Sequence, residues 1–329
     1  MRSITYLQAI NEALDEALAN DTCVFLLGED IGVYGGGFGA TQGLQEKYGK
    51  LRVRDTPISE SAIAGVAVGS AMTGMRPVIE LQFSDFITVA MDQLVNQAAK
   101  IHYMYSGKAN VPLVMRTAAG SGTGAGAQHS QSLENWTAHI PGLKVIQPSD
   151  AYDAKGLLHA AINDNNPVMF YEHKLLYKTI GRVPEESYSI PIGVADIKRS
   201  GKDITVIATG IMVSKALEAA EIVEKFGVSI EVIDPRTLVP LDHKTILTSV
   251  KKTQRVIIIT EAVKSSGFGA ELASIIAESK LVMNLKAPIV RLGGEFVPMP
   301  AQKLLETYAI PQVESIVEAI KQIMPEVEV

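Results

Sequence analysis

A glutamate stands at the start of an apolar segment, where its carboxyl group could take part in acid–base chemistry. Glu60 lies in "PISES", behind the strand-like run "LRV" and directly ahead of "AIAGVAVGSAM". Pro57 and Ser59 are typical of a helix start, and a carboxylate in the first turn is stabilised by the positive end of the helix dipole. Local sequence therefore explains Glu60 as a helix-start residue, and a catalytic role needs support from other segments.

Two glycine-rich segments each follow a predicted strand. They are "GVYGGGFGATQG" (32–43) and "AAGSGTGAGAQHSQS" (118–132). Neither has the G-x-G-x-x-G or G-x-x-x-x-G-K-[ST] spacing of nucleotide-binding loops. The second has glycine at every second position from Gly120 to Gly126 and continues into His129. Ligands of α/β proteins bind at the carboxyl ends of parallel strands, so this segment is either a flexible surface loop or part of a ligand site.

Histidines and aromatic residues give further candidates. His129 and His139 do not have the spacing of a metal pair on one helix face, and the sequence has no H-E-x-x-H, so zinc is not expected. His159 lies in a helical pattern and is predicted to pack or to lie on the surface. Phe83 and Phe86 follow the strand "PVIEL". At least one of them is expected to hold the strand-to-helix turn against the core.

The elements that must position these residues alternate between short apolar strands and longer helices. This alternation indicates an α/β fold with mainly parallel sheets and helices on both faces. The segment 176–200 is polar and irregular, with one or two short strands expected in it. Two domains are therefore expected, 1–185 and 201–329, with 186–200 as a linker. The predicted strands are 24–30, 77–81, 111–117, 144–148, 167–172, 203–210, 228–235, 255–261 and 288–294. The predicted helices are 5–19, 61–74, 88–103, 151–163 (with a serine cap at Ser149), 213–226, 242–251, 267–279 and 313–324.

Composition excludes several classes of protein. The net charge is −6 and the pI is near 5.6, so the chain lacks the excess of basic residues that is typical of a nucleic-acid-binding protein. Cys23 is the one cysteine, so no internal disulfide is possible, and its apolar neighbours predict a buried side chain. No run of about 18 apolar residues indicates a membrane span, and the N-terminus does not resemble a secretory signal. We therefore expect a soluble, cytoplasmic protein.

Several segments taken together resemble one protein family. They are "LGEDIGVYGGGFGATQGL", "DTPISESAIAGVAVGSAMTGMRPVIELQF", "DQLVNQAAK", "GAQHSQSLENWTAHIPGLKVIQPSDAYDAKGLLHAAINDNNPV" and "VIDPRTLVPLD". In order and over essentially the whole chain, they are similar to β subunits of the thiamine-diphosphate-dependent 2-oxo acid dehydrogenases. The resemblance implies a transketolase-like architecture of two three-layer α/β domains. Residues 1–185 would form the pyrimidine-binding domain and 201–329 the transketolase C-terminal domain.

The resemblance also implies a second type of subunit. In this family an α subunit holds the diphosphate of thiamine diphosphate through Mg²⁺, and two α and two β subunits assemble. The diphosphate motif contains Gly-Asp-Gly, which occurs nowhere in this chain. The chain is therefore expected to supply only the aminopyrimidine half of the cofactor site.

Glu60 matches the catalytic glutamate of the family. Its carboxyl group would hydrogen-bond the pyrimidine ring and share a proton with it. A water-poor pocket suits this role, because burial raises a carboxyl pKa toward neutral pH. The apolar neighbours Ile58, Ala62 and Ile63 are expected to line such a pocket.

Other positions also match functional residues of the family. Phe86 matches the aromatic residue that packs on the aminopyrimidine, and Leu81 and Gln82 match nearby cofactor-binding positions. His129 matches the active-site histidine near the channel of the lipoyl arm, where it would transfer a proton or stabilise charge during reductive acylation. The resemblance further implies a monovalent cation, usually K⁺, held by the backbone carbonyls of Leu113, Ala161, Ile162, Asp164 and Asn166.

The implied activity is that of an acyl-transferring pyruvate dehydrogenase. It would decarboxylate the 2-oxo acid and reductively acylate the lipoyl group of a dihydrolipoyl acyltransferase, the second expected partner. The segments "AQHSQSLENW" and "NDNNP" are closer to pyruvate and acetoin enzymes than to branched-chain ones. Acetoin dehydrogenase and branched-chain 2-oxo acid dehydrogenase remain alternatives. A non-catalytic assembly subunit and an independent dinucleotide oxidoreductase are readings from other classes, disfavoured by the presence of Glu60 and by the glycine spacing.

Overall fold

The computed structural model describes residues 1–325, which form two compact units. Unit 1 comprises Met1–Ala119 and Trp136–Ile192, and unit 2 comprises Gly120–Asn135 and the chain from Gly193 onward. Each unit has its own largely parallel sheet covered by helices. Unit 2 thus takes residues 120–135 from within the expected first domain. The last four residues of the expected second domain, 326–329, lie outside the described residues.

Unit 1 is built on a parallel sheet with the strand order β6-β7-β5-β4-β2-β3. Strands β2, β5 and β7 are buried along their whole length, which explains why they read as continuous apolar runs. Two further strands, β1 and β8, form a separate antiparallel pair. The strands are β1 (Arg2–Thr5), β2 (Val24–Gly28), β3 (Val53–Asp55), β4 (Arg76–Leu81), β5 (Val114–Ala119), β6 (Lys144–Ile146), β7 (Val168–His173) and β8 (Ile180–Val183).

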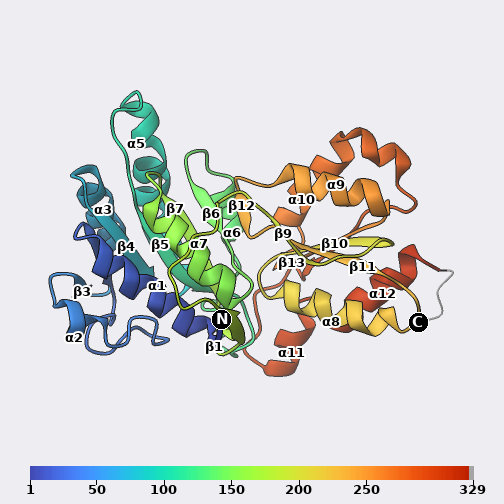
Figure 1. Ribbon diagram of the computed structural model, residues 1–329, viewed down its shortest axis with the longest axis horizontal. Coiled ribbons are helices and arrows are strands. Elements are labelled where there is room, and N and C mark those ends of the chain that lie inside the picture. Colours follow the sequence, from blue (N-terminus) through green and yellow to red (C-terminus); the bar gives the residue numbers. More distant parts are fainter. Residues whose placement is uncertain (326–329) are drawn as a thin grey trace. The chain divides into compact units, whose positions relative to one another are not determined.

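Helices cover both faces of this sheet. Connections between parallel strands are right-handed, and β3-α3-β4 and β4-α4-β5 run across the sheet in the direction opposite to β6-α7-β7. Their helices therefore lie on opposite faces, with α1 packed along α7 (Figure 1). The unit is a three-layer α/β domain. Its helices are α1 (Tyr6–Asn20), α2 (Leu44–Tyr48), α3 (Glu60–Met72), η1 (Ser84–Phe86), α4 (Ile87–Met91), η2 (Asp92–Ala98), α5 (Ala99–Met104), α7 (Ala151–Asn163) and η3 (Lys174–Leu176).

Three local expectations for unit 1 were wrong. The predicted helix 88–103 is interrupted by a π-helical stretch, η2. The 3.6-residue apolar pattern used for the prediction does not distinguish a π-helical turn from an α-helical one. Asp150, rather than Ser149, caps α7, and its carboxylate accepts a 2.8 Å bond from the Asp153 backbone N–H. Cys23 is half-buried rather than buried.

Unit 2 contains a five-stranded sheet with the order β14-β13-β10-β11-β9, in which only β9 is antiparallel. Helices α8 and α12 pack together on one face, and α9 and α10 lie on the other (Figure 1). The short helix α6 (Glu134–Ala138) spans the boundary between the two units. The remaining elements are β9 (Asp196–Arg199), β10 (Ile204–Ala208), α8 (Met212–Glu224), β11 (Ile230–Asp234), β12 (Thr237–Val239), α9 (His243–Thr253), β13 (Val256–Val263), α10 (Phe268–Glu278), η4 (Lys280–Asn284), β14 (Val290–Gly294), α11 (Lys303–Tyr308) and α12 (Val313–Ile323).

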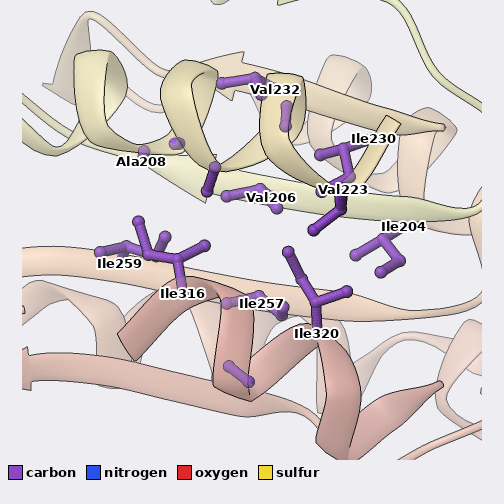
Figure 2. Packing of buried hydrophobic residues seen from close by; sticks show 14 of the residues in the cluster. Ile204, Val206, Ala208, Val223, Ile230, Val232, Ile257, Ile259, Ile316 and Ile320 are labelled. Carbon is purple, nitrogen blue, oxygen red and sulfur yellow. The ribbon is translucent and has the colours of Figure 1, made fainter. Parts of the chain in front are cut away.

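The core of unit 2 consists of branched aliphatic side chains from three central strands and two helices. Side chains of β10, β11 and β13 meet those of α8 and α12 (Figure 2). Ile316 and Ile320 of α12 are fully buried there, as expected for residues four apart on one helix face. Among residues 1–325, no helix is long and apolar enough to cross a membrane.

Candidate functional site

Two carboxyl groups meet where strands of the unit 1 sheet end. Glu60 is the first residue of α3 and is only 8% exposed. Glu29 directly follows β2, and its carboxylate accepts a hydrogen bond from the Ser59 backbone N–H. Burial raises the pKa of Glu29, and the charge of Glu60 raises that pKa further. One Glu29 oxygen, Oε1, is buried without a hydrogen-bond partner among the described residues. Glu29 can therefore hold a proton more readily than an exposed carboxyl group, and its Oε1 can still accept a donor.

The predicted apolar surroundings of Glu60 are only partly present in this chain. Ile63 is 2% exposed, whereas Ile58 is 82% exposed and Ala62 is also exposed. Ile63 faces the interior because it lies one turn after Ser59 on the buried side of α3. Local sequence did not separate the two sides of this helix, since apolar residues occur all round it.

The predicted cofactor-binding residues of β4 lie at the carboxyl end of that strand. Leu81 is its last residue and is buried, and Gln82 follows it half-buried. Both line a small recess in unit 1, and the side chain of Gln82 approaches Gly37 of the first glycine-rich segment. A Cβ at Gly37 would lie 3.4 Å from the Gln82 side chain, which is ordinary van der Waals contact.

Phe86 is half-buried in η1, directly after β4. Its ring lies edge-on to that of Phe83, with 6.0 Å between the ring centroids. Phe83 in turn packs edge-on against Phe38 at 5.7 Å, and the Lys174 ammonium lies 5.3 Å from its centroid. Phe83 thus joins Phe86 to Phe38 across this turn, and both Phe83 and Phe86 keep part of their surface accessible.

A buried group of charges, which local sequence analysis missed, underlies this edge of the sheet. Arg116 of β5 donates to Glu172 of β7 (2.7 and 2.8 Å) and to Glu80 of β4 (2.7 Å). The Tyr177 hydroxyl also donates to Glu172, at 2.9 Å. Burial raises the pKa of Glu172, and the two carboxylates keep the pKa of Arg116 above its ordinary value despite its burial. A charged residue inside the apolar run "VPLVMRTAA" was the available signal.

The other predicted catalytic residue, His129, belongs to unit 2 and is half-buried. Its backbone N–H donates to the Gly126 carbonyl at 3.2 Å. The structure thus brings Glu60, Phe86, Leu81 and Gln82 into one unit and places His129 in the other. A pocket of about 340 Å³ in unit 2 is lined by Ser130–Leu133, which follow His129 in the chain, and by Phe296–Met299 among others.

The remaining histidines have ordinary surroundings. His159 is buried where α7 packs on α1, and its Nε2 lies 2.8 Å from a Glu16 carboxylate oxygen. His139 and His243 are exposed. In the described part of the chain, no group of three or more His, Cys, Asp or Glu side chains could hold a metal ion.

Four of the five backbone positions of the predicted cation site lie in the last turn of α7 or directly after it in unit 1. Ala161 and Ile162 belong to that turn, Asp164 caps the helix and Asn166 follows. The fifth, Leu113, precedes β5, and its carbonyl accepts from the Val168 N–H. The Arg76 guanidinium already donates to the Ile162 and Asp164 carbonyls, both at 3.0 Å. A carbonyl oxygen has two lone pairs, so these oxygens can still accept a cation.

Removal of the Glu29 carboxyl group should alter how stability depends on pH. Because the pKa of Glu29 is raised in the folded chain, the folded state binds this proton more tightly than the unfolded state. Stability contributed by Glu29 is then fully present below its ordinary value of 4.5 and declines as pH rises above it. Glu29→Gln should therefore gain stability relative to the wild type between about pH 4 and about pH 7. Urea titrations of both proteins across this range measure the difference, and a constant difference would contradict a raised pKa of Glu29 in the folded chain.

Comparisons with known proteins agree with a fold of two α/β domains. Residues 2–179 match the family model "Transketolase, pyrimidine binding domain", and residues 193–316 match "Transketolase, C-terminal domain". The "Split gene transketolase, inactive beta4 tetramer" has the same fold, with a TM-score of 0.79 at 24% identity and coverage of 98% of both chains.

Relatives with named activities extend over nearly the whole chain. The chain is 47% identical to the 2-oxoisovalerate dehydrogenase subunit beta of Bacillus subtilis (strain 168), covering 98% of this chain and 99% of that protein. It is 45% identical to the acetoin:2,6-dichlorophenolindophenol oxidoreductase subunit beta of the same bacterium (99% and 98% covered). It is 46% identical to the mitochondrial pyruvate dehydrogenase E1 component subunit beta-2 of Oryza sativa subsp. japonica (98% and 86% covered). The chain therefore belongs to the family of β subunits of 2-oxo acid and acetoin dehydrogenases, oxidoreductase components with transketolase-like domains.

Proposed function

We propose that the chain is the β subunit of a pyruvate dehydrogenase (acetyl-transferring) and supplies Glu60 to its active site. Membership of this family implies dependence on thiamine diphosphate and a partner α subunit. The observation that carries the proposal is the pair formed by Glu60 and Glu29 at the carboxyl edge of the sheet in the pyrimidine-binding domain. Ligand sites of α/β folds occur at this edge.

The residues present fit an aminopyrimidine. Such a ring offers both hydrogen-bond donors and acceptors. Glu29 has a buried oxygen without a partner among the described residues, and its raised pKa favours a shared proton. Phe86, with part of its ring accessible, would stack on the heterocycle, while Leu81 and Gln82 would contact its edge. Thiamine diphosphate supplies the carbanion chemistry when bound. Glu60 would hold a proton toward the pyrimidine ring, and Mg²⁺ would be held by the α subunit.

His129 is proposed to serve the second half of the reaction. It would transfer a proton or stabilise charge while the lipoyl group of a dihydrolipoyl acyltransferase is acylated. A half-buried imidazole suits this role, because imidazole is a common general acid and base and this side chain remains accessible to a second substrate. An assembly with two α and two β subunits is proposed for the intact enzyme.

The choice of pyruvate rests on "AQHSQSLENW" and "NDNNP". Acetoin and branched-chain 2-oxo acids are the alternative substrates, and the relatives named for all three have similar identities to this chain. Reconstitution with the matching α subunit, thiamine diphosphate and Mg²⁺ tests the proposal. Reduction of 2,6-dichlorophenolindophenol should be fastest with pyruvate. Faster reduction with acetoin or 2-oxoisovalerate would reassign the substrate, and no reduction with any of them would overturn the proposed function.

A K⁺ ion is proposed at the carbonyls of Leu113, Ala161, Ile162, Asp164 and Asn166. The ion would share the Ile162 and Asp164 carbonyls with Arg76, while the Asp164 carboxylate is paired with Lys144. Because a cation that binds only the folded chain stabilises it, KCl should raise the melting temperature above that in choline chloride at equal ionic strength. Equal melting temperatures in the two salts would count against this site.

Two further assignments accompany the proposed function. The domain division at 1–185, 186–200 and 201–329 remains a prediction, which limited proteolysis tests by the position of the first cleavage. A cytoplasmic location also remains a prediction, which cell fractionation tests.

A further inference from the structure

The loop that leads to His129 is held by two acidic side chains from distant parts of unit 2. The Ser121 backbone N–H and hydroxyl both donate to Glu261 of β13, at 2.6 and 2.8 Å. The Gly122 N–H donates to Glu306 of α11 at 2.7 Å, and the Gly124 N–H donates to the same carboxylate at 3.1 Å. These bonds use the backbone N–H groups of residues 121, 122 and 124 and one hydroxyl, all on one limb of the loop.

The alternating glycines explain how the loop offers these donors. Gly120, Gly122, Gly124 and Gly126 all have positive φ, between 69° and 98°. Backbone that alternates between left-handed and other conformations turns successive N–H groups toward one side and forms a concave anion site. Here the anions are the chain's own carboxylates. The spacing that is wrong for a dinucleotide turn is therefore suited to binding Glu261 and Glu306.

Both acidic side chains are buried, which makes these contacts specific. Glu261 is 5% exposed and Glu306 is 2% exposed. Hydrogen bonds from backbone N–H groups to an ionised carboxylate are stronger than those between neutral groups, and a buried carboxylate without them is costly. The loop conformation is therefore determined from outside the loop.

The same loop fixes the backbone of His129. Its base is closed by the Gly120 N–H, which donates to the Gln131 carbonyl at 3.3 Å. On the opposite limb the His129 N–H donates to Gly126 at 3.2 Å. The glycines of these two bonds, Gly120 and Gly126, stand before and after the segment bound by Glu261 and Glu306. The bonds therefore connect that segment to the backbone at His129.

We propose that Glu261 and Glu306 are positioning residues for His129: they hold the glycine-rich loop in the conformation required for acyl transfer to the lipoyl group. The inference rests on the proposed function of His129. It predicts that loosening the loop slows the lipoyl-dependent step more than the decarboxylation that precedes it.

The test compares Glu306→Gln with Glu318→Gln, a control at an exposed position of α12 in the same unit. Glutamine keeps the size of the side chain but removes its charge and one acceptor. In Glu306→Gln, hydrogen–deuterium exchange of the peptide containing Gly122 and Gly124 should accelerate about tenfold or more. In the reconstituted enzyme, the rate of acylation of a lipoylated acyltransferase domain should fall about tenfold more than the rate of dye-coupled decarboxylation. Glu318→Gln should match the wild type in both measurements.

Gly124→Ala provides a second variant in case Glu306→Gln fails to fold. A Cβ at this left-handed position would meet the Ala301 carbonyl oxygen at 3.2 Å, so it disturbs the loop while leaving both carboxylates intact. The same pattern of exchange and rates is expected.

Each outcome decides one part of the inference. Unchanged exchange in the loop peptide overturns the anchoring role, whatever the rates are. Faster exchange with an equal loss of both partial reactions overturns the positioning of His129. Absence of decarboxylation in the wild type with every substrate overturns the proposed function and with it the catalytic meaning of the loop, while the exchange result still decides the anchoring.

Discussion

Glu60→Gln lowers the turnover number of the reconstituted enzyme about 100-fold or more, because a positioned acid–base group contributes about 10²–10⁴-fold to a rate. Glutamine fills the same space at the start of α3 but cannot share a proton. The expected loss lies in kcat rather than in assembly, since the variant keeps the shape of a residue that is only 8% exposed. Dye-coupled oxidation of pyruvate measures the rate, and size-exclusion chromatography with the α subunit measures assembly.

The matched control is Glu46→Gln, which removes an exposed carboxylate from α2 of the same unit. It should retain the wild-type rate. Glu60→Gln should also lower the pKa of Glu29, because the charge of Glu60 contributes to raising it. Full activity in Glu60→Gln would show that Glu60 is not a catalytic residue.

Arg116→Met destabilises unit 1 by about 3–5 kcal/mol, because removal of one partner from a buried ion pair leaves an uncompensated charge. Glu80 and Glu172 would then face each other as like charges, and both are at most 7% exposed. Urea unfolding followed by the fluorescence of Trp136, the chain's one tryptophan and part of unit 1, measures the loss.

The pH dependence of this loss of stability distinguishes unpaired charge from lost packing. Burial raises the pKa of Glu172 even in the presence of Arg116, so the unpaired carboxyls of the variant should take up protons readily. The destabilisation should therefore shrink between about pH 8 and about pH 5. Arg182→Met, at an exposed position of β8, is the control and should change the free energy of unfolding by less than about 0.5 kcal/mol. A loss in Arg116→Met that does not depend on pH would indicate packing instead of charge.

The α/β alternation could be predicted from the sequence because it depends on local patterns. Buried parallel strands such as β5 and β10 produce continuous apolar runs, and amphipathic helices such as α1 and α7 produce a 3.6-residue period. The short strand β1 was missed, because a strand of four residues has no distinctive period, whereas β8 and β9 agree with the one or two short strands expected in 176–200. The start of α3 at Glu60 was indicated by the residues before it.

Pairings between distant residues were decided only by the tertiary structure. Glu261 and Glu306 lie 140 and 184 residues from the backbone groups that they bind. Arg116 lies 36 residues from Glu80 and 56 from Glu172, on neighbouring strands. Periodicity shows which side of an element is buried, but it carries no information about which distant element covers that side. The sequence alone therefore determined that Glu60, Phe86 and His129 were candidates, and that the glycines alternate. The fold decided that the charge of Glu60 acts on Glu29 and that two buried carboxylates hold the glycine-rich loop, because both depend on how distant elements pack rather than on neighbours in the chain.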